Sequence, residues 1–185
     1  MSSADLTNLL GRAEQLLSRL EVLLPHPLQE PDWSASIAWR YRKRGGAWGG
    51  AVLDPIRHVS RISYSDLKEV DTQKERFARN LAQFVAGRPA NHVLLTGARG
   101  TGKSSLVKAG LDAHGADGLR LIEVDKADMI DLPDLIERVA TRPERFIVFC
   151  DDLSFEDGEP GYKALKSILD GTVSAAGENV LIIST

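Results

Sequence analysis

The sequence of 185 residues has one cysteine, no long apolar run and few aromatic residues. Because Cys150 has no second cysteine to pair with, an internal disulfide is excluded, and the four scattered histidines lack the spacing of a zinc site. The longest apolar run, residues 146–150, is far shorter than the roughly 18 residues that a membrane-spanning helix needs. No early lysine or arginine precedes an apolar stretch at the N-terminus, so a secretory signal is not expected. These absences predict a cytoplasmic protein without a membrane segment.

A large excess of positive charge is also missing. The net charge is −3, with 43% hydrophobic and 26% charged residues, which is typical of globular proteins and excludes collagen, coiled-coil rods and full disorder. The acidic excess lies in residues 62–185, whereas residues 1–61 are slightly basic. A protein that binds nucleic acid over its whole surface is therefore not expected, and any such contact would be local.

The first 24 residues have the pattern of an amphipathic helix, which Pro25 ends. The apolar positions are Leu6, Leu9, Leu10, Ala13, Leu16, Leu17, Leu20, Leu23 and Leu24. Their intervals of three and one residues place them on one stripe of a helix. Two interpretations stay open: the helix packs on the rest of its own chain, or its leucines form a seam for a partner or a second copy.

Residues 25–65 form a segment rich in proline, tryptophan and glycine, with little periodicity. Aromatic and basic residues alternate at its centre, in the run Trp39, Arg40, Tyr41, Arg42, Lys43 and Arg44. This alternation, followed by two glycines, predicts a β-hairpin whose charged face is solvated. The alternative is local contact with nucleic acid, in which the rings stack on bases and the basic groups bind phosphates.

From residue 66 onward, apolar segments suited to strands alternate with helical patterns. Strands are expected at 93–96, 119–124, 146–150 and 180–184, and helices at about 71–85, 103–113, 132–141 and 162–169. We expect Asp71 to cap the first of these helices. Strands separated by helices predict an α/β fold with a parallel sheet and right-handed crossovers. The chain therefore divides into an N-terminal helix (1–24), an irregular segment (25–65) and an α/β core (66–185).

A glycine-rich segment lies between the first expected strand of the core and the helix that follows it. Residues 97–104 match the pattern G-x-x-x-x-G-K-[ST] at every position, whereas a dinucleotide fingerprint fails because Ser105 replaces its third glycine. The glycines let backbone N–H groups turn inward around a phosphate, and the helix presents its positive end to the same anion. Lys103 can reach the β- and γ-phosphates, and the Ser104 hydroxyl can bind magnesium. The predicted phosphate-binding residues are Gly97, Ala98, Arg99, Gly100, Thr101, Gly102, Lys103, Ser104 and Ser105.

Two carboxylates directly follow the apolar strand at 146–150. Asp151 should lie at the carboxyl edge of the sheet beside the glycine-rich loop, where it can hold magnesium through water. A complete strand–helix unit precedes this strand, so we expect the strand at 180–184 to lie between it and the strand before the loop. The alternative interpretation is that Asp151 and Asp152 simply begin a surface loop.

These motifs together resemble the AAA+ division of P-loop ATPases. Residues 66–74, 97–108 and 150–156 are similar to a family of bacterial AAA+ ATP-binding proteins without an assigned cellular role, and the resemblance covers about residues 48–185. It implies a P-loop NTPase three-layer α/β sandwich that binds ATP or ADP with Mg²⁺. It also implies that residues 67–74 border the adenine.

The resemblance further implies hydrolysis by in-line attack of water. AAA+ proteins usually have a glutamate after the magnesium-associated aspartate, and this sequence has Asp152, which is one methylene shorter. Asp152 is therefore the first candidate to orient the water, and Glu156 is the second. A polar sensor residue, a fifth strand, an arginine finger and a helical lid should lie beyond residue 184, so we expect this chain to be part of a longer protein.

The leading hypothesis is an AAA+ ATPase module that couples ATP hydrolysis to engaging or remodelling a macromolecular partner, a protein rather than a nucleic acid. Self-association through AAA+ subunit contacts is implied as well. One alternative is a nucleotide-dependent binding module with little or no hydrolysis, whose N-terminal helix and residues 25–65 contact the partner. Another alternative is a nucleic-acid-directed ATPase, in which the basic residues of the same segment contact phosphates.

Overall fold

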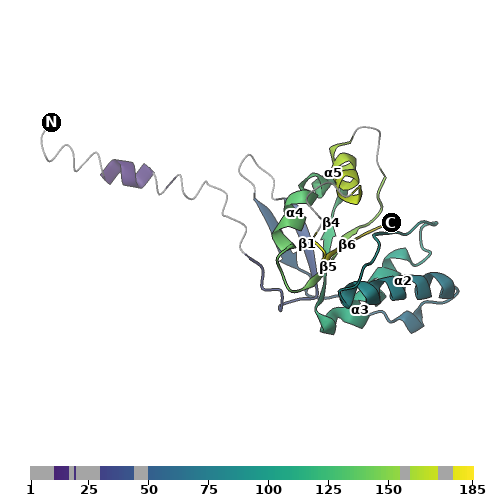
Figure 1. Ribbon diagram of the computed structural model, residues 1–185. Coiled ribbons are helices and arrows are strands. Elements are labelled where there is room, and N and C mark those ends of the chain that lie inside the picture. Colours follow the sequence, from purple (N-terminus) through teal and green to yellow (C-terminus); the bar gives the residue numbers. More distant parts are fainter. Residues whose placement is uncertain (1–10, 17–18, 20–29, 44–49, 155–158, 171–176) are drawn as a thin grey trace, which may run out of the picture. The chain divides into compact units, whose positions relative to one another are not determined.

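The computed structural model describes residues 11–16, 19, 30–43, 50–154, 159–170 and 177–185. Residue contacts divide the chain into two units, the smaller comprising Met1–Glu30 and Lys43–Val52 and the larger Pro31–Arg42 and Leu53–Thr185. In the smaller unit, residues 11–16 and 19 are helical, as the leucine pattern predicts for these positions (Figure 1). Most of the leucines of the predicted helix lie outside the described residues. The larger unit carries most of the sheet and all the residues of the site described below.

A six-stranded sheet forms the centre of the fold. Its strands are β1 (Ala38–Lys43), β2 (Ala51–Pro55), β3 (Val93–Leu94), β4 (Leu119–Val124), β5 (Arg145–Cys150) and β6 (Val180–Ser184). Their order in the sheet is β2-β1-β4-β5-β6-β3. The pairs β1–β4, β4–β5, β5–β6 and β6–β3 are all parallel. The prediction that the 180–184 strand lies between the 146–150 strand and the strand before the glycine-rich loop is therefore confirmed.

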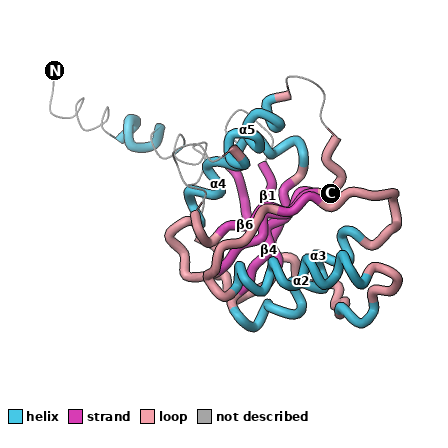
Figure 2. The backbone as a smooth tube through the Cα atoms, turned by 45° about the vertical axis from the view of Figure 1, so that its right-hand side comes forward, coloured by secondary structure: helices cyan, strands magenta, loops and turns pink. Residues whose placement is uncertain are grey.

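Helices cover both faces of this sheet, which gives a three-layer α/β arrangement (Figure 2). The α-helices are α2 (Asp71–Val85), α3 (Lys103–His114), α4 (Leu132–Val139) and α5 (Pro160–Leu169). Short 3₁₀ turns occur at Tyr64–Asp66, Gly115–Asp117 and Lys126–Asp131. In both views α2 and α3 lie on one side of the sheet, and α4 and α5 lie on the other.

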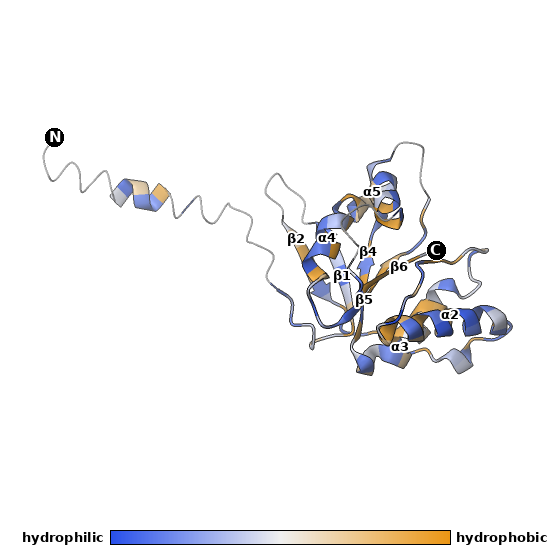
Figure 3. Ribbon diagram, in the orientation of Figure 1, coloured by the Kyte–Doolittle hydropathy of each residue, from blue (hydrophilic) through white to orange (hydrophobic). Residues whose placement is uncertain are grey.

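The continuous apolar strands owe their composition to this double cover. Every residue of β6, and every residue of β5 after Arg145, is buried, as expected for parallel strands with helices on both faces. Figure 3 shows hydrophobic residues on β5 and β6, and both hydrophobic and hydrophilic residues on the surrounding helices. Phe77, Leu81 and Phe84 of α2 pack with α3 and the sheet in one core cluster. The helical spacing of these three residues is thus explained by burial of a single helix face.

Two local predictions need correction. Asp71 does not cap α2: the cap residue is Val70, and Asp71 lies in the first turn, where its carboxylate pairs with Lys74 at 2.7 Å. An acidic side chain still suits this position, because the N-terminus of a helix is electropositive. The strand expected at 93–96 extends only over Val93–Leu94, because the chain turns into the glycine-rich loop soon after its last ladder bond, from the Leu95 N–H to the Ser184 carbonyl.

The segment from residue 25 to 65 is less separate than the sequence indicated. β1 lies inside the sheet, parallel to β4, with Ala38 opposite Leu121. Trp39 and Tyr41 are buried, and the Trp39 ring packs edge-on against Trp33 with 5.0 Å between centroids. β1 and β2 are consecutive in the chain and neighbours in the sheet, as the predicted hairpin requires, but the other edge of β1 pairs with β4, so this strand belongs to the central sheet. The same burial removes both rings from the surface, where stacking on nucleic-acid bases would require them.

Candidate functional site

The glycine-rich loop connects β3 to the N-terminus of α3, as its sequence context predicts. Gly97, Gly100 and Gly102 have φ angles of 145°, 84° and 87°. Such backbone conformations are strained for residues with a Cβ atom, so the glycines of the motif are needed for the path of the loop. Gly102 is the residue that caps α3, so the loop delivers the next two side chains, Lys103 and Ser104, into the first turn of the helix. This places free helix N–H groups and a lysine at the same point.

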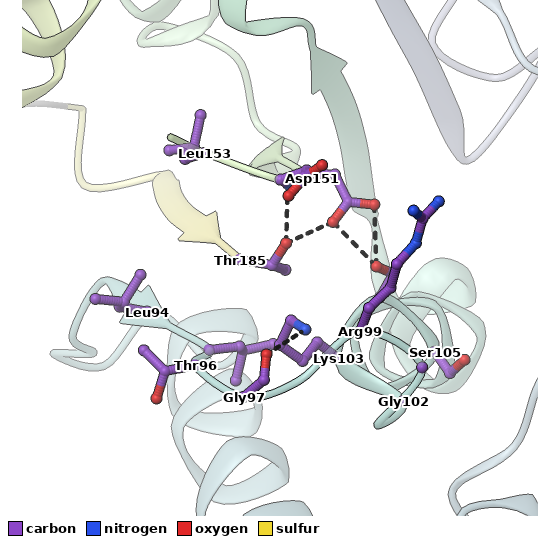
Figure 4. A pocket seen from close by; sticks show the side chains of 14 residues that line it. Leu94, Thr96, Gly97, Arg99, Gly102, Lys103, Ser105, Asp151, Leu153 and Thr185 are labelled. Carbon is purple, nitrogen blue, oxygen red and sulfur yellow. Dashed lines mark hydrogen bonds between the residues drawn. The ribbon is translucent and has the colours of Figure 1, made fainter. Parts of the chain in front are cut away.

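The loop side chains fold back onto the loop's own carbonyl groups. Lys103 Nζ donates hydrogen bonds to the carbonyl oxygens of Gly97 and Ala98, both at 3.0 Å, and the bond to Gly97 is drawn in Figure 4. Thr101 Oγ1 donates to the same Ala98 carbonyl at 2.9 Å. The Lys103 ammonium therefore lies across the loop, at the concave surface that would face an anion. These bonds are solvent-exposed, so an anion could replace them at little cost.

Asp151 meets the loop from the other side of the sheet edge. It follows β5 directly, and its two carboxylate oxygens accept hydrogen bonds from Ser104 Oγ at 3.1 Å and 3.0 Å. The contact is possible because the carboxyl ends of β3, β6 and β5 share one edge of the sheet. The two residues predicted to organise magnesium, which are 47 positions apart in the chain, are thus in contact.

Thr185 completes this cluster, and sequence analysis did not assign it. Its Oγ1 donates to Asp151 Oδ1 at 2.5 Å and accepts the backbone N–H of Asp152 at 3.0 Å. Backbone bonds reinforce the connection, since the Thr185 N–H donates to Cys150 and the Leu153 N–H donates to the Thr185 carbonyl. The available signal was positional: Thr185 is the polar residue just beyond the 180–184 strand, where a sensor residue was expected.

Asp152 has an unusual backbone conformation, with a φ of 54°. Left-handed conformations are uncommon for residues other than glycine, and aspartate is among those that adopt them most readily. The side chain is exposed and lines the same pocket as Lys103 and Ser104. Its position is compatible with contact to a bound molecule. Glu156, the second candidate, lies outside the described residues.

A pocket of about 580 Å³, called here the loop pocket, brings these residues together (Figure 4). It is lined by Leu94, Leu95, Thr96, Gly97, Arg99, Gly100, Gly102, Lys103, Ser104, Ser105, Asp151, Asp152, Leu153 and Thr185. Ala98 and Thr101 are absent from this lining, although both are joined to it by the bonds within the loop. Nearly all the predicted site residues therefore face one volume, and it is large enough for a small ligand.

Residues 67–74 are not part of this lining. Leu67 packs against the core cluster formed with α2 and α3, and its carbonyl accepts a hydrogen bond from Lys74 Nζ at 3.2 Å. Glu69, between them, has a φ of 60°. The segment is thus held by its own contacts, and its expected border with an adenine stays a prediction.

The donor set at Ser104 and Asp151 fits magnesium. Mg²⁺ binds oxygen ligands, and it commonly takes one or two from the protein and the rest from phosphates and water. In the part of the chain that the structure describes, no group of three or more histidine, cysteine or acidic side chains could hold a metal ion alone. A hydroxyl and a carboxylate beside the glycine-rich loop are therefore sufficient only for a metal that arrives with further oxygen ligands.

Cys150, next to Asp151, does not contribute a reactive thiolate. The side chain is fully buried, and burial raises the pKa of the Cys150 thiol to about 12. A protonated, enclosed thiol is a poor nucleophile and a poor metal ligand. This cysteine serves packing within the strand that positions Asp151.

A comparison with protein-family models identifies the family of this chain. No curated protein matches the chain. Among the described residues, no helix has both the length and the apolar character needed to cross a membrane. Residues 34–185 match the family described as protein of unknown function (DUF815), a match that names neither a nucleotide nor a reaction. It extends from before β1 to the last residue of the site just described, so the match takes in β1 and β2 together with the loop and Asp151. The chain therefore belongs to the DUF815 family of uncharacterised proteins.

Proposed function

We propose that this protein is a magnesium-dependent ATP-binding module of the AAA+ type that hydrolyses ATP and couples hydrolysis to a macromolecular partner. One observation carries the proposal: the loop at residues 97–104 lies between β3 and α3, and Asp151 reaches Ser104 across an inserted strand. If the loop were only a glycine turn followed by a surface lysine, nothing would require the Asp151 carboxylate to lie within hydrogen-bond distance of Ser104. The choice of ATP over other nucleotides, and of a protein partner, rests on the resemblance to AAA+ proteins.

The roles follow from the geometry. The loop glycines and the N-terminus of α3 favour the polyphosphate, and Lys103 exchanges its bonds with loop carbonyls for bonds to phosphate oxygens. Ser104 Oγ and the Asp151 carboxylate would hold the metal ion, which would offset the negative charge of the phosphates that opposes attack by water. Thr185 holds the Asp151 carboxylate in place.

The attacking water requires a hydrogen-bond acceptor. Asp152 is exposed, lines the loop pocket and immediately follows Asp151, so its carboxylate can accept a hydrogen bond from water near the phosphates. Its backbone N–H is fixed by Thr185 Oγ1 at 3.0 Å, which ties the position of Asp152 to the end of β6.

Substitution of the loop lysine tests the binding part of the proposal. Lys103→Ala should weaken ATP binding at least about tenfold, because a charge-assisted bond to phosphate contributes about 1.5–3 kcal/mol. The measurement is titration with a fluorescent ATP analogue in the presence of Mg²⁺. Lys163→Ala, an exposed lysine of α5, is the matched control and should bind as the wild type does. Unchanged affinity in Lys103→Ala would contradict the proposal.

A second candidate is a nucleotide-dependent binding module that hydrolyses little or no ATP. The specific observation in its favour is Asp152, whose side chain is shorter than glutamate and whose backbone is left-handed. Phosphate release measured under multiple-turnover conditions separates the two candidates. Lys103-dependent turnover supports the ATPase, whereas tight ATP binding without turnover supports the binding module.

A further inference from the structure

A second cavity, of about 200 Å³, lies behind the loop pocket and is called here the rear cavity. Ser104 and Asp151 line both volumes. The rest of the rear cavity is formed by β1, β4, α3 and residues 56–60, with Arg40, Glu123 and Lys108 among its charged side chains. The proposed metal ligands therefore separate a space for the nucleotide from a second space with charged walls.

Strand register explains why Arg40 and Glu123 face this cavity. Arg40 lies opposite Glu123 in the β1–β4 pair, and Glu123 lies opposite Phe149 in the β4–β5 pair. Side chains two residues apart on a strand point to the same face, so Asp151, two residues beyond Phe149, continues the row. The row ends on the face covered by α3, which carries Ser104.

The Arg40–Glu123 pair leaves one carboxylate oxygen unused. Arg40 Nε and Nη2 both donate to Glu123 Oε2, at 3.0 Å and 2.7 Å, and this bond raises the pKa of Arg40. Within the described part of the chain, Glu123 Oε1 has no hydrogen-bond partner. Since it is not one of the buried polar atoms without a partner, this oxygen is accessible to water. The arginine thus fixes the carboxylate and leaves an acceptor available to the cavity.

We propose that Glu123 is a positioning residue of the ATP site, whose free oxygen accepts a hydrogen bond from water bound to the magnesium ion. This inference rests on the proposed function. Bound magnesium usually keeps several water molecules, and because Ser104 and Asp151 line both cavities, such water could lie in either of them. With the nucleotide in the loop pocket, the rear cavity of about 200 Å³ is left for water.

The role of Arg40 follows from the same geometry. A carboxylate that accepts bonds from metal-bound water orients that water and strengthens metal binding. Without Arg40, the Glu123 side chain would gain rotamer freedom, and the bond to water would become less favourable. The structure thus brings Arg40 of β1, a strand that precedes the glycine-rich loop in the chain by more than the length of α2, into the surroundings of the proposed metal.

The test measures magnesium affinity, not only turnover. Glu123→Gln removes the negative charge but keeps the shape, and it should raise the Mg²⁺ concentration that half-saturates ATP-dependent thermal stabilisation about tenfold or more, as outer-shell substitutions typically do. ATP binding measured in EDTA should not change. Glu123→Asp, which keeps the charge and shortens the side chain, should give a smaller increase. Glu75→Gln is the matched control, since Glu75 forms an exposed pair with Arg79 at 2.7 Å on α2.

A purely structural ion pair predicts a different result. In that case Glu123→Gln and Arg40→Ala would lower the unfolding temperature of the nucleotide-free protein, and the double variant Arg40→Glu/Glu123→Arg would restore it, all with the wild-type Mg²⁺ requirement. An unchanged requirement in both Glu123→Gln and Glu123→Asp overturns the inference while wild-type binding of Mg-ATP stands. Absence of any ATP effect on the wild type instead overturns the proposed function, and the inference falls with it.

Discussion

At the residue scale, the hydroxyl of Thr185 joins the two carboxylate positions that follow β5. Asp151 and Asp152 could be predicted from sequence, because carboxylates directly after a buried strand are a local pattern. Thr185 could be placed just beyond a strand, but its contact with Asp151 depends on β6 lying beside β5, which is a non-local property. The same applies to Arg40 and Glu123, which are 83 residues apart and share no local signal.

Asp152→Asn tests the water-orienting role at this scale. The amide keeps the size of the side chain but is a much weaker proton acceptor, so ATP affinity should be retained and turnover should fall about 10²-fold or more. Phosphate release and binding of a fluorescent ATP analogue measure the two effects separately. Asp112→Asn, an exposed carboxylate of α3, is the control. Turnover at the wild-type rate in Asp152→Asn would remove this residue from the mechanism.

At the element scale, the strands and helices of the core follow from local patterns, whereas the neighbours of β1 do not. Strands 119–124 and 180–184 have the predicted bounds, because each is rich in apolar residues and is flanked by residues that break a strand, Gly118 and Asp125 for the first and Asn179 for the second. β1 has an equally clear alternation, but alternation does not determine which strand it pairs with. Its parallel pairing with β4 buries Trp39 and Tyr41, an outcome set by the rest of the sheet.

The start of β6 is held by a buried asparagine, which gives a prediction for stability. Asn179 Nδ2 lies 2.8 Å, 3.1 Å and 3.2 Å from the carbonyl oxygens of Val139, Arg142 and Glu144. Asn179→Ala would remove the side-chain donor from all three carbonyl groups, of which the Val139 carbonyl keeps a second donor, the Arg142 N–H at 3.0 Å. The substitution should lower the free energy of unfolding by about 2 kcal/mol, measured by urea denaturation.

A second asparagine provides the control for this measurement. Asn80 also forms two bonds to backbone, with the N–H and the carbonyl of Asn91, but these bonds are exposed to solvent. Water replaces exposed bonds, so Asn80→Ala should cost less than about 1 kcal/mol. Equal losses in the two variants would show that burial does not determine the contribution of Asn179.

At the scale of the whole molecule, burial of titratable side chains makes the free energy of unfolding fall at alkaline pH. Burial raises the pKa values of the Cys150 thiol and the Tyr64 hydroxyl, each to about 12. In the unfolded chain these groups ionise at about 8.5 and about 10. Between those values and 12 the folded state retains protons that the unfolded state has released, so the free energy of unfolding must fall as the pH rises.

Urea denaturation near neutral pH and at about pH 10 measures this fall. Cys150→Ala should reduce the pH dependence by up to about 1.4 kcal/mol per pH unit, because one titrating group is removed. Tyr64→Phe should flatten the curve at higher pH, and the loss of its hydroxyl should be tolerated because that buried oxygen has no partner among the described residues. Identical pH profiles in the wild type and both variants would contradict this account.

The register between β1 and β4 has a consequence for how the chain tolerates change in length. Trp39 and Arg40 are adjacent and point to opposite faces of the sheet, one into the apolar layer beside Phe146 and the other into the rear cavity. A slip of one residue exchanges the two faces. The slip would place the Arg40 guanidinium in the core and the Trp39 indole against Ser104 and Asp151. Each of these misplaced side chains would raise the free energy of the slipped state. A one-residue insertion or deletion at positions 34–37 should therefore be far more damaging than a point substitution there. The side chains on both faces of β1 allow only one register with β4.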